Sequence, residues 1–142
     1  MRTKLALILL TLFSAACVHS ELTLKDETNR SELEEAVRQI NDVKGCEVVR
    51  IDSEGFIRVH YGDLSEYPGA TARYENAEII LRADSNSSGT KLIRTIQHEI
   101  GHAFGLTHTD GSCDIMNAMD RGGCQYEDEA LEAFVELLGD CP

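Results

Sequence analysis

The sequence contains no tryptophan and only two prolines, and aromatic residues make up just 6% of its 142 residues. It is also short of cations, since 13 lysines and arginines face 25 aspartates and glutamates and leave a formal charge of −12. This balance argues against nucleic acid or an anionic membrane as an electrostatic partner. No apolar run reaches the roughly 20 residues that a membrane-spanning helix needs. The hydrophobic fraction of 42% nevertheless exceeds that of a disordered acidic segment, so we expect one folded domain.

The first residues have the layout of an export signal. Two cations precede a nine-residue apolar run, Leu5–Phe13, which small residues follow. We therefore assign residues 1–16 to a signal peptide and residues 17–142 to a single domain, and we expect an exported protein, secreted or periplasmic. The end of this segment also resembles a bacterial lipobox, in which Cys17 would be lipidated and would anchor the protein at the cell surface. Ordinary cleavage without lipidation is the alternative.

The remaining chain predicts an α+β domain. Apolar and polar residues alternate as in strands in some segments, and recur at helical spacing in others. The pattern Ser31 to Glu34 is typical of a capping box, and Gly45 and Gly105 are placed to end helices. Pro68 and Gly69 suit an edge strand. We expect strands at 21–26, 46–51, 56–61, 70–74 and 78–83, and helices at 28–43, 90–104 and 127–138.

Residues 98–108, which read HEIGHAFGLTH, carry the chemistry. His98 and His102 are four residues apart in a predicted helix, so both imidazoles project from one face and can reach a single zinc ion. Gly105 would then break the helix and let His108 return to the same metal. Three histidine ligands leave the fourth position for water, as in a catalytic zinc site. Glu99 lies beside the metal without being needed as a ligand.

This segment matches the metzincin signature H-E-x-x-H-x-x-G-x-x-H residue for residue. The chain therefore resembles the metzincin zinc metallopeptidases, most of all a minimal bacterial matrixin. The resemblance implies a zincin-like fold with a twisted mixed sheet, an active-site helix, a methionine-containing turn and a C-terminal helix. Met116 fits the Met-turn residue, with Met119 as the alternative. Ala118 stands where some relatives have a tyrosine that acts as a switching ligand, so no such ligand is expected.

The resemblance also implies an activity. It indicates a zinc-dependent endopeptidase with one catalytic zinc, in which zinc-bound water attacks the peptide bond and Glu99 is the general base. Protein or peptide substrates would pair with the edge strand, at Gly69, Ala70, Thr71, Ala72, Arg73 and Tyr74. We expect a monomer that binds no nucleic acid and meets a membrane only through a lipid anchor. The alternatives are a zinc-binding homologue without turnover and a zincin that cleaves a non-protein amide.

Four cysteines remain beyond Cys17, an even number that in an exported protein predicts two disulfides. Three pairings exist, and buried reduced thiols are the alternative. In the light of the resemblance we favour Cys113–Cys124, which brackets Met116, and Cys46–Cys141, which ties the C-terminal tail to the first half of the chain. No Cys-x-x-Cys pattern favours zinc binding by cysteine.

The many acidic residues allow two further interpretations. Asp52, Asp63 and Asp84 lie near predicted loops and are candidate calcium ligands, although such aspartates more often form turns. The acidic helix around residues 127–132 is typical of a solvated surface. A preference for basic substrates is the other reading of the overall negative charge.

Overall fold

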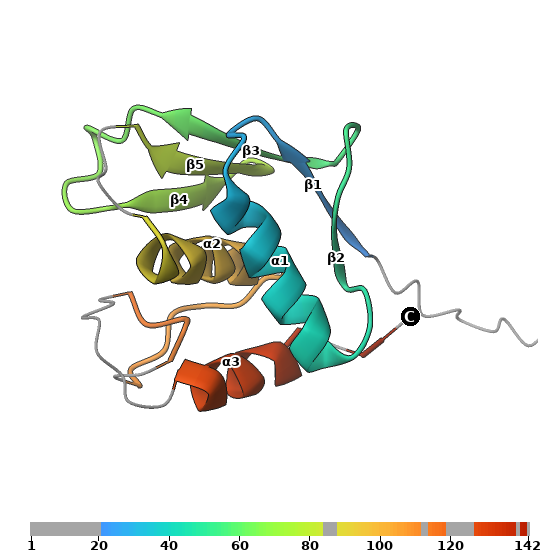
Figure 1. Cartoon of the computed structure of the whole chain (residues 1–142). Helices are drawn as coiled ribbons and strands as arrows, with labels where there is room; N and C mark the ends of the chain where they lie inside the picture. Colours follow the sequence, from blue (N-terminus) through green and yellow to red (C-terminus); the bar gives the residue numbers. More distant parts are fainter. Residues whose placement is uncertain (1–20, 84–87, 112–113, 119–126, 139, 142) are drawn as a thin grey trace, which may run out of the picture.

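The computed structural model describes residues 21–83, 88–111, 114–118, 127–138 and 140–141. The expected signal peptide, Cys17, the Cys113–Cys124 pair, Met119 and Asp84 lie outside these residues. None of the described helices is both long enough and apolar enough to cross a membrane. In chain order the described elements (Figure 1) are β1 (Leu22–Asp26), α1 (Ser31–Lys44), β2 (Val49–Ile51), β3 (Ile57–Gly62), β4 (Ala72–Glu75), β5 (Glu78–Arg82), α2 (Thr90–Ala103) and α3 (Glu127–Glu136).

The strands form one mixed sheet in the order β2-β1-β3-β5-β4. All neighbouring pairs are parallel except β4 and β5, which are antiparallel. Within the described residues, β4 lies at the edge and has one unpaired side, which confirms the predicted edge strand. The strand starts only at Ala72, because Gly69 has a φ of 87° and the Ala70 amide bonds the Tyr67 carbonyl oxygen at 3.1 Å, so the chain still turns there. The predicted α+β fold class is confirmed.

The link between β2 and β3 is a crossover rather than a hairpin. β2 ends beside Leu24 of β1, with Ile51 opposite, and β3 begins on the other side of the same residue, with Ile57 opposite. The linking residues therefore pass across the β1 backbone. Gly55 lies at this crossing, where a Cβ would come within 2.6 Å of the Leu24 carbonyl oxygen. Any side chain there would collide with main-chain atoms, so the crossover requires glycine.

α1 begins three residues later than its sequence pattern suggests. The predicted capping box at Ser31 is wrong, because Arg30 is the N-cap residue and no side chain caps the helix. Asp26 instead accepts hydrogen bonds from the backbone amides of Thr28, at 2.7 Å, and Asn29, at 3.2 Å. Asn29 has a φ of 54°, which is incompatible with a right-handed helix. This local turn delays the helix until Ser31.

The helices α1 and α2 cover one face of the sheet, and α3 packs against α1 (Figure 1). Alternate strand residues point into this interface, as the period of two in a half-buried strand requires. Each fully buried aliphatic side chain contributes about 1.5–3 kcal/mol to the stability of the fold. The largest buried aliphatic side chains of the strands and of α1 and α2 are Leu24, Val49, Ile57, Ile79, Leu81, Leu33, Ile40, Ile96 and Ile100.

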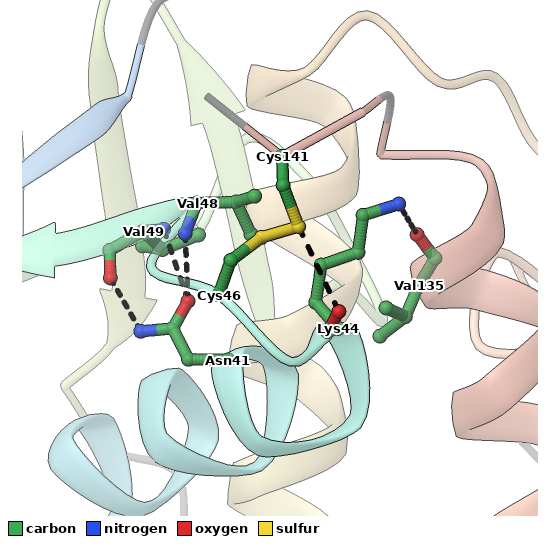
Figure 2. The surroundings of a disulfide bond; sticks show 7 residues. All are labelled: Asn41, Lys44, Cys46, Val48, Val49, Val135 and Cys141. Carbon is green, nitrogen blue, oxygen red and sulfur yellow. Dashed lines mark hydrogen bonds between the residues drawn. A yellow bond between two sulfur atoms is a disulfide. The ribbon is translucent and has the colours of Figure 1, made fainter.

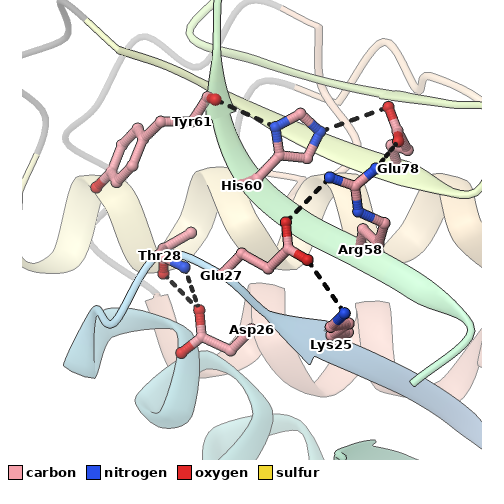
Figure 3. A network of polar contacts seen from close by, with 8 residues as sticks. All are labelled: Lys25, Asp26, Glu27, Thr28, Arg58, His60, Tyr61 and Glu78. Carbon is pink, nitrogen blue, oxygen red and sulfur yellow. Dashed lines mark hydrogen bonds and ion pairs between the residues drawn. The ribbon is translucent and has the colours of Figure 1, made fainter. Parts of the chain in front are cut away.

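The opposite face of the sheet carries a ladder of charges across β1, β3 and β5 (Figure 3). Arg58 bridges Glu27 at 3.0 Å and Glu78 at 2.8 Å, and Lys25 lies 3.3 Å from Glu27. His60 reaches Glu78 at 3.4 Å. The hydrogen bond from Arg58 holds the pKa of Glu27 below its usual value. These ion pairs are exposed and add little stability each, but they keep this face of the sheet polar.

The end of α1 is held to the rest of the chain by a disulfide and by an asparagine (Figure 2). Cys46 and Cys141 are bonded, with their Cα atoms 5.9 Å apart, which confirms that predicted pair. Asn41 donates from Nδ2 to the Val49 carbonyl oxygen at 2.7 Å and accepts from the Val48 amide at 3.0 Å. The disulfide and the asparagine together join α1 to β2 and to the segment that follows α3.

Candidate metal centre

The helix α2 positions the first two histidines. Its residues Leu92, Ile96 and Ile100 are buried in the core, while His98 and His102 line a cleft on the other side. Gly105 then adopts a φ of 87°, and the chain reverses there as predicted. The reversal brings His108 back to the same cleft.

The three imidazoles converge on one point. The Nε2 atom of His102 lies 3.1 Å from that of His98 and 3.1 Å from that of His108, and the remaining pair is separated by 3.3 Å. Among the described residues, these three histidines form a group whose ligand atoms lie close enough together to hold one metal ion. Tetrahedral zinc with bonds of about 2.0–2.1 Å would hold its ligand atoms about 3.3–3.4 Å apart. The observed separations therefore fit three ligands of one such ion.

Backbone carbonyls set the orientation of two rings. His98 Nδ1 lies 2.6 Å from the Ile115 carbonyl oxygen, and His102 Nδ1 lies 2.8 Å from the Leu106 carbonyl oxygen. A carbonyl oxygen can only accept a hydrogen bond, so each Nδ1 must carry the proton. In the neutral rings, Nε2 then presents a lone pair toward its neighbours. Lone pairs at such short range repel one another unless a cation lies between them, which is the chemistry of a zinc ligand set.

Glu99 supplies a buried carboxylate next to these ligands. It is 5% exposed, yet it lines the cleft, and its Oε2 atom has no hydrogen-bond partner among the described residues. Burial raises the pKa of Glu99, while His102, a backbone hydrogen bond at Tyr74 and the charge of Arg73 act in the opposite direction. A buried oxygen without a hydrogen-bond partner is costly, so the Oε2 atom of Glu99 is suited to accept a hydrogen bond from a ligand or a water molecule.

The turn around Met116 forms the floor beneath α2. Met116 is 2% exposed and packs directly on Gly101, where a Cβ would also come within 2.8 Å of the Phe134 ring. The Thr109 amide donates to the Met116 carbonyl oxygen at 3.0 Å, which ties the turn to the residue that follows His108. Gly101 therefore lets the floor approach the helix backbone, and the floor in turn supports the segment that carries the third histidine.

The site lies in a cleft of about 850 Å³. One wall is the stretch predicted to bind substrate, Gly69 to Tyr74, and the other is α2. Ile115, Asn117 and Ala118 close the cleft beyond the histidines. The edge strand β4, the three imidazoles and Glu99 therefore line one and the same cleft.

The two described aspartates considered for calcium act as turn formers. Asp52 accepts a hydrogen bond from the Glu54 amide at 2.9 Å, and Asp63 accepts one from the Ser65 amide at 2.8 Å. The bond from Ser65 holds the pKa of Asp63 below its usual value. Neither carboxylate joins a cluster of three or more ligand side chains within the described residues.

The signature predicts the three histidines and Glu99, and the structure brings these four into one cleft. Met116, which the resemblance predicts, packs against Gly101 of α2. The signature does not predict the carbonyl groups that orient the rings, or the role of Gly101. Nor does it predict Lys91 and Arg94, which line the cleft on α2. Their spacing of seven and four residues before His98 was the available signal, since it puts them on the same helix face.

No curated protein matches the chain. The family model of the matrixins matches residues 39–130, which contain the three histidines, Glu99, Met116 and the edge strand. This match covers more than half of the sequence and agrees with the mixed sheet, the helix α2 and the histidine cluster. The chain belongs to the matrixin family of peptidases.

Proposed function

We propose that this protein is a zinc-dependent endopeptidase that hydrolyses peptide bonds in proteins or peptides. The observation that carries the proposal is the convergence of three Nε2 atoms within 3.3 Å of one another, beside a buried carboxylate in an open cleft. A purely structural zinc site would use four protein ligands and close the ion off from water. Three ligands in a cleft leave a position for a reactant.

Metal binding and proton transfer fall to different residues of the chain. His98, His102 and His108 would hold the ion through Nε2. When bound, zinc supplies a Lewis acid that polarises a water molecule and the substrate carbonyl group. Glu99 accepts a proton from the attacking water and then delivers it to the nitrogen of the leaving amine, so that the peptide C–N bond breaks and a carboxylate and an amine are released. Burial raises the pKa of Glu99, which favours the first of these transfers because a more basic carboxylate accepts a proton more readily.

The edge strand would orient the substrate. β4 has one side free within the described residues, and an extended peptide can add to it as a further antiparallel strand. Main-chain hydrogen bonds of this kind recognise the peptide backbone without demanding a particular sequence. They would also hold the scissile bond steady over the histidines.

Substitution of Glu99 separates catalysis from metal binding. We expect Glu99→Gln to keep about one zinc per chain, measured by elemental analysis, and to lower the hydrolysis of denatured casein by about 10²–10⁴-fold. Glu132→Gln, which changes an exposed carboxylate on α3, is the matched control and should retain activity. Full activity in Glu99→Gln would refute the assignment. A parent protein that binds zinc but cleaves neither casein nor gelatin, with or without a chelator, would identify a homologue without turnover.

We also propose that the protein is exported and works as a monomer, secreted, periplasmic or lipid-anchored through Cys17. The charged and apolar layout of residues 1–16 supports export. The Cys46–Cys141 bond supports it independently, because disulfides persist in oxidising compartments. The mass of the mature protein gives the test: a diacylated Cys17 identifies the anchor, and an uncleaved N-terminus in the cytosolic fraction contradicts export.

A further inference from the structure

The walls of the cleft carry a charge opposite to that of the whole protein. The lining includes three cationic side chains, Arg73, Lys91 and Arg94, and one carboxylate, Glu99. The whole chain has a formal charge of −12. Exposed charges are screened over about 8–10 Å in physiological salt, so a bound peptide responds mainly to the nearby groups. The lining thus has three cations and one carboxylate, and Glu75, outside the lining, neutralises part of the charge of Arg73. A charge preference of the cleft therefore depends on these groups more than on the total charge of the chain.

Arg73 is held in place on the β4 wall. Its guanidinium lies 3.8 Å from the centre of the Tyr67 ring, and its Nε atom donates to Glu75 at 2.9 Å. The two terminal nitrogens make no hydrogen bond to other described residues. A guanidinium oriented in this way loses little freedom on binding, and a carboxylate is the partner that matches its geometry.

Lys91 provides a second cation on the α2 wall. It lies in the first turn of α2 and is exposed, and its ammonium makes no ion pair within the described part of the chain. Seven residues separate it from His98, which places it on the same helix face and about 10 Å along the axis. Arg94 lies between them on that face and also lines the cleft. An extended peptide covers this distance in about three residues.

We propose that the cleft selects peptides that carry aspartate or glutamate within about three residues of the cleaved bond, with Arg73 and Lys91 as the residues that determine this specificity. The inference rests on the proposed function, since it concerns the substrate of the same site. Because Arg73 lies on the β4 wall and Lys91 on the α2 wall, an acidic side chain can meet a cation on either side of the cleft.

The size of the preference follows from the exposure of the groups. An exposed ion pair strengthens the binding of an aspartate peptide by up to about fivefold. A lysine at the same peptide position is repelled by the same cation, which weakens binding. We therefore expect aspartate peptides to exceed matched lysine peptides in kcat/KM by about 5- to 20-fold at low salt. At 1 M salt the screening length falls to about 3 Å, so the ratio should approach one.

The test uses the zinc-loaded mature chain and matched peptides. A peptide library first identifies a cleaved neutral sequence, which is then resynthesised with aspartate, alanine or lysine at each of three positions on both sides of the cut. Lys91→Glu and Arg73→Gln should each lower the aspartate-to-lysine ratio by about 3- to 10-fold. Lys25→Glu makes the same charge change as Lys91→Glu on β1, three strands from the edge strand, and should leave the ratio unchanged.

The outcomes separate this inference from the proposed function. Equal cleavage of the three peptides, or faster cleavage of the lysine peptide, would overturn the specificity while leaving the peptidase intact. An equal change in Lys25→Glu and Lys91→Glu would assign the effect to total charge and also overturn it. If no peptide is cleaved, fluorescence anisotropy of the labelled peptides measures binding instead. Tighter binding of the aspartate peptide that Lys91→Glu abolishes would support the inference, and equal affinities would refute it.

Discussion

Replacement of Gly101 by alanine sets two well-defined effects against each other. Alanine in the interior of a helix is favoured over glycine by about 0.5–1 kcal/mol, so Gly101→Ala should stabilise α2 if only the helix mattered. The new Cβ would, however, come within 2.8 Å of the Phe134 ring and closer still to the Met116 sulfur. Both partners are buried, with 3% and 2% exposure, so neither can move into solvent.

The steric effect should win. Overpacking of a filled core costs about 1–3 kcal/mol, which exceeds the helix preference. We therefore expect Gly101→Ala to lower the free energy of unfolding by about 1–2 kcal/mol. Met116 follows Ile115, whose carbonyl oxygen lies 2.6 Å from His98 Nδ1. A displaced floor should thus also weaken zinc binding, by about 10–100-fold if that hydrogen bond is lost.

A double-mutant cycle tests the reasoning. Urea unfolding followed by circular dichroism, with a chelator present, measures stability apart from metal binding. Met116→Ala alone should cost about 2–5 kcal/mol by leaving a cavity. In the double variant the methyl group introduced by Gly101→Ala enters that space, so the combined cost should fall at least about 1 kcal/mol below the sum. Costs that add to within about 0.5 kcal/mol, or a stabilised Gly101→Ala, would refute the steric explanation.

Four further perturbations follow from other parts of the structure. Asn41→Ala should lower the free energy of unfolding by about 1–3 kcal/mol, because it leaves the amides of Val48 and Val49 and the carbonyl of Val49 without this partner; an unchanged urea midpoint would contradict this. Replacing both Cys46 and Cys141 by serine should cost about 2–5 kcal/mol, and equal midpoints for parent and variant without reductant would count against it. Chelation should lower the melting temperature and excess zinc should restore it. In His108→Ala, which removes an exposed proposed ligand, that zinc-dependent shift should disappear while the far-ultraviolet spectrum is retained, and a full shift would exclude His108 as a ligand.

The parts of the site that follow from local geometry were predictable from the sequence. Helical spacing alone puts His98 and His102 on one face, and a glycine three residues later allows the reversal that returns His108. Both glycine stops are present, with φ of 77° at Gly45 and 87° at Gly105. Each of these features depends on neighbours within a few residues, which is why a pattern could indicate them.

Features set by distant contacts were not predictable in this way. The crossover at Gly55 depends on where β1 lies, some 30 residues earlier in the chain. Gly101 occupies a variable position of the signature, and only its contact with Met116 and Phe134 gives it a role. The capping-box pattern at Ser31 failed because the turn before it, closed by Asp26, governs where the helix begins.

The charge of the cleft is another feature that depends on contacts between distant residues. Composition gives one total for the whole chain, whereas a bound peptide meets the few groups that the fold gathers around it. Arg73 and Lys91 are 18 residues apart and come from a strand and a helix. They line one cleft because α2 packs beneath β4, and amino-acid composition does not predict that packing.

The histidine rings are aligned by the carbonyl groups of Leu106 and Ile115, and this has a consequence for the engineering of the protein. Every amino acid carries that acceptor, so other residues at 106 and 115 would still present it wherever the main chain keeps its course. Both side chains also line the cleft. Variation at these two positions could therefore reshape the cleft around a bound peptide while the backbone continues to orient His98 and His102.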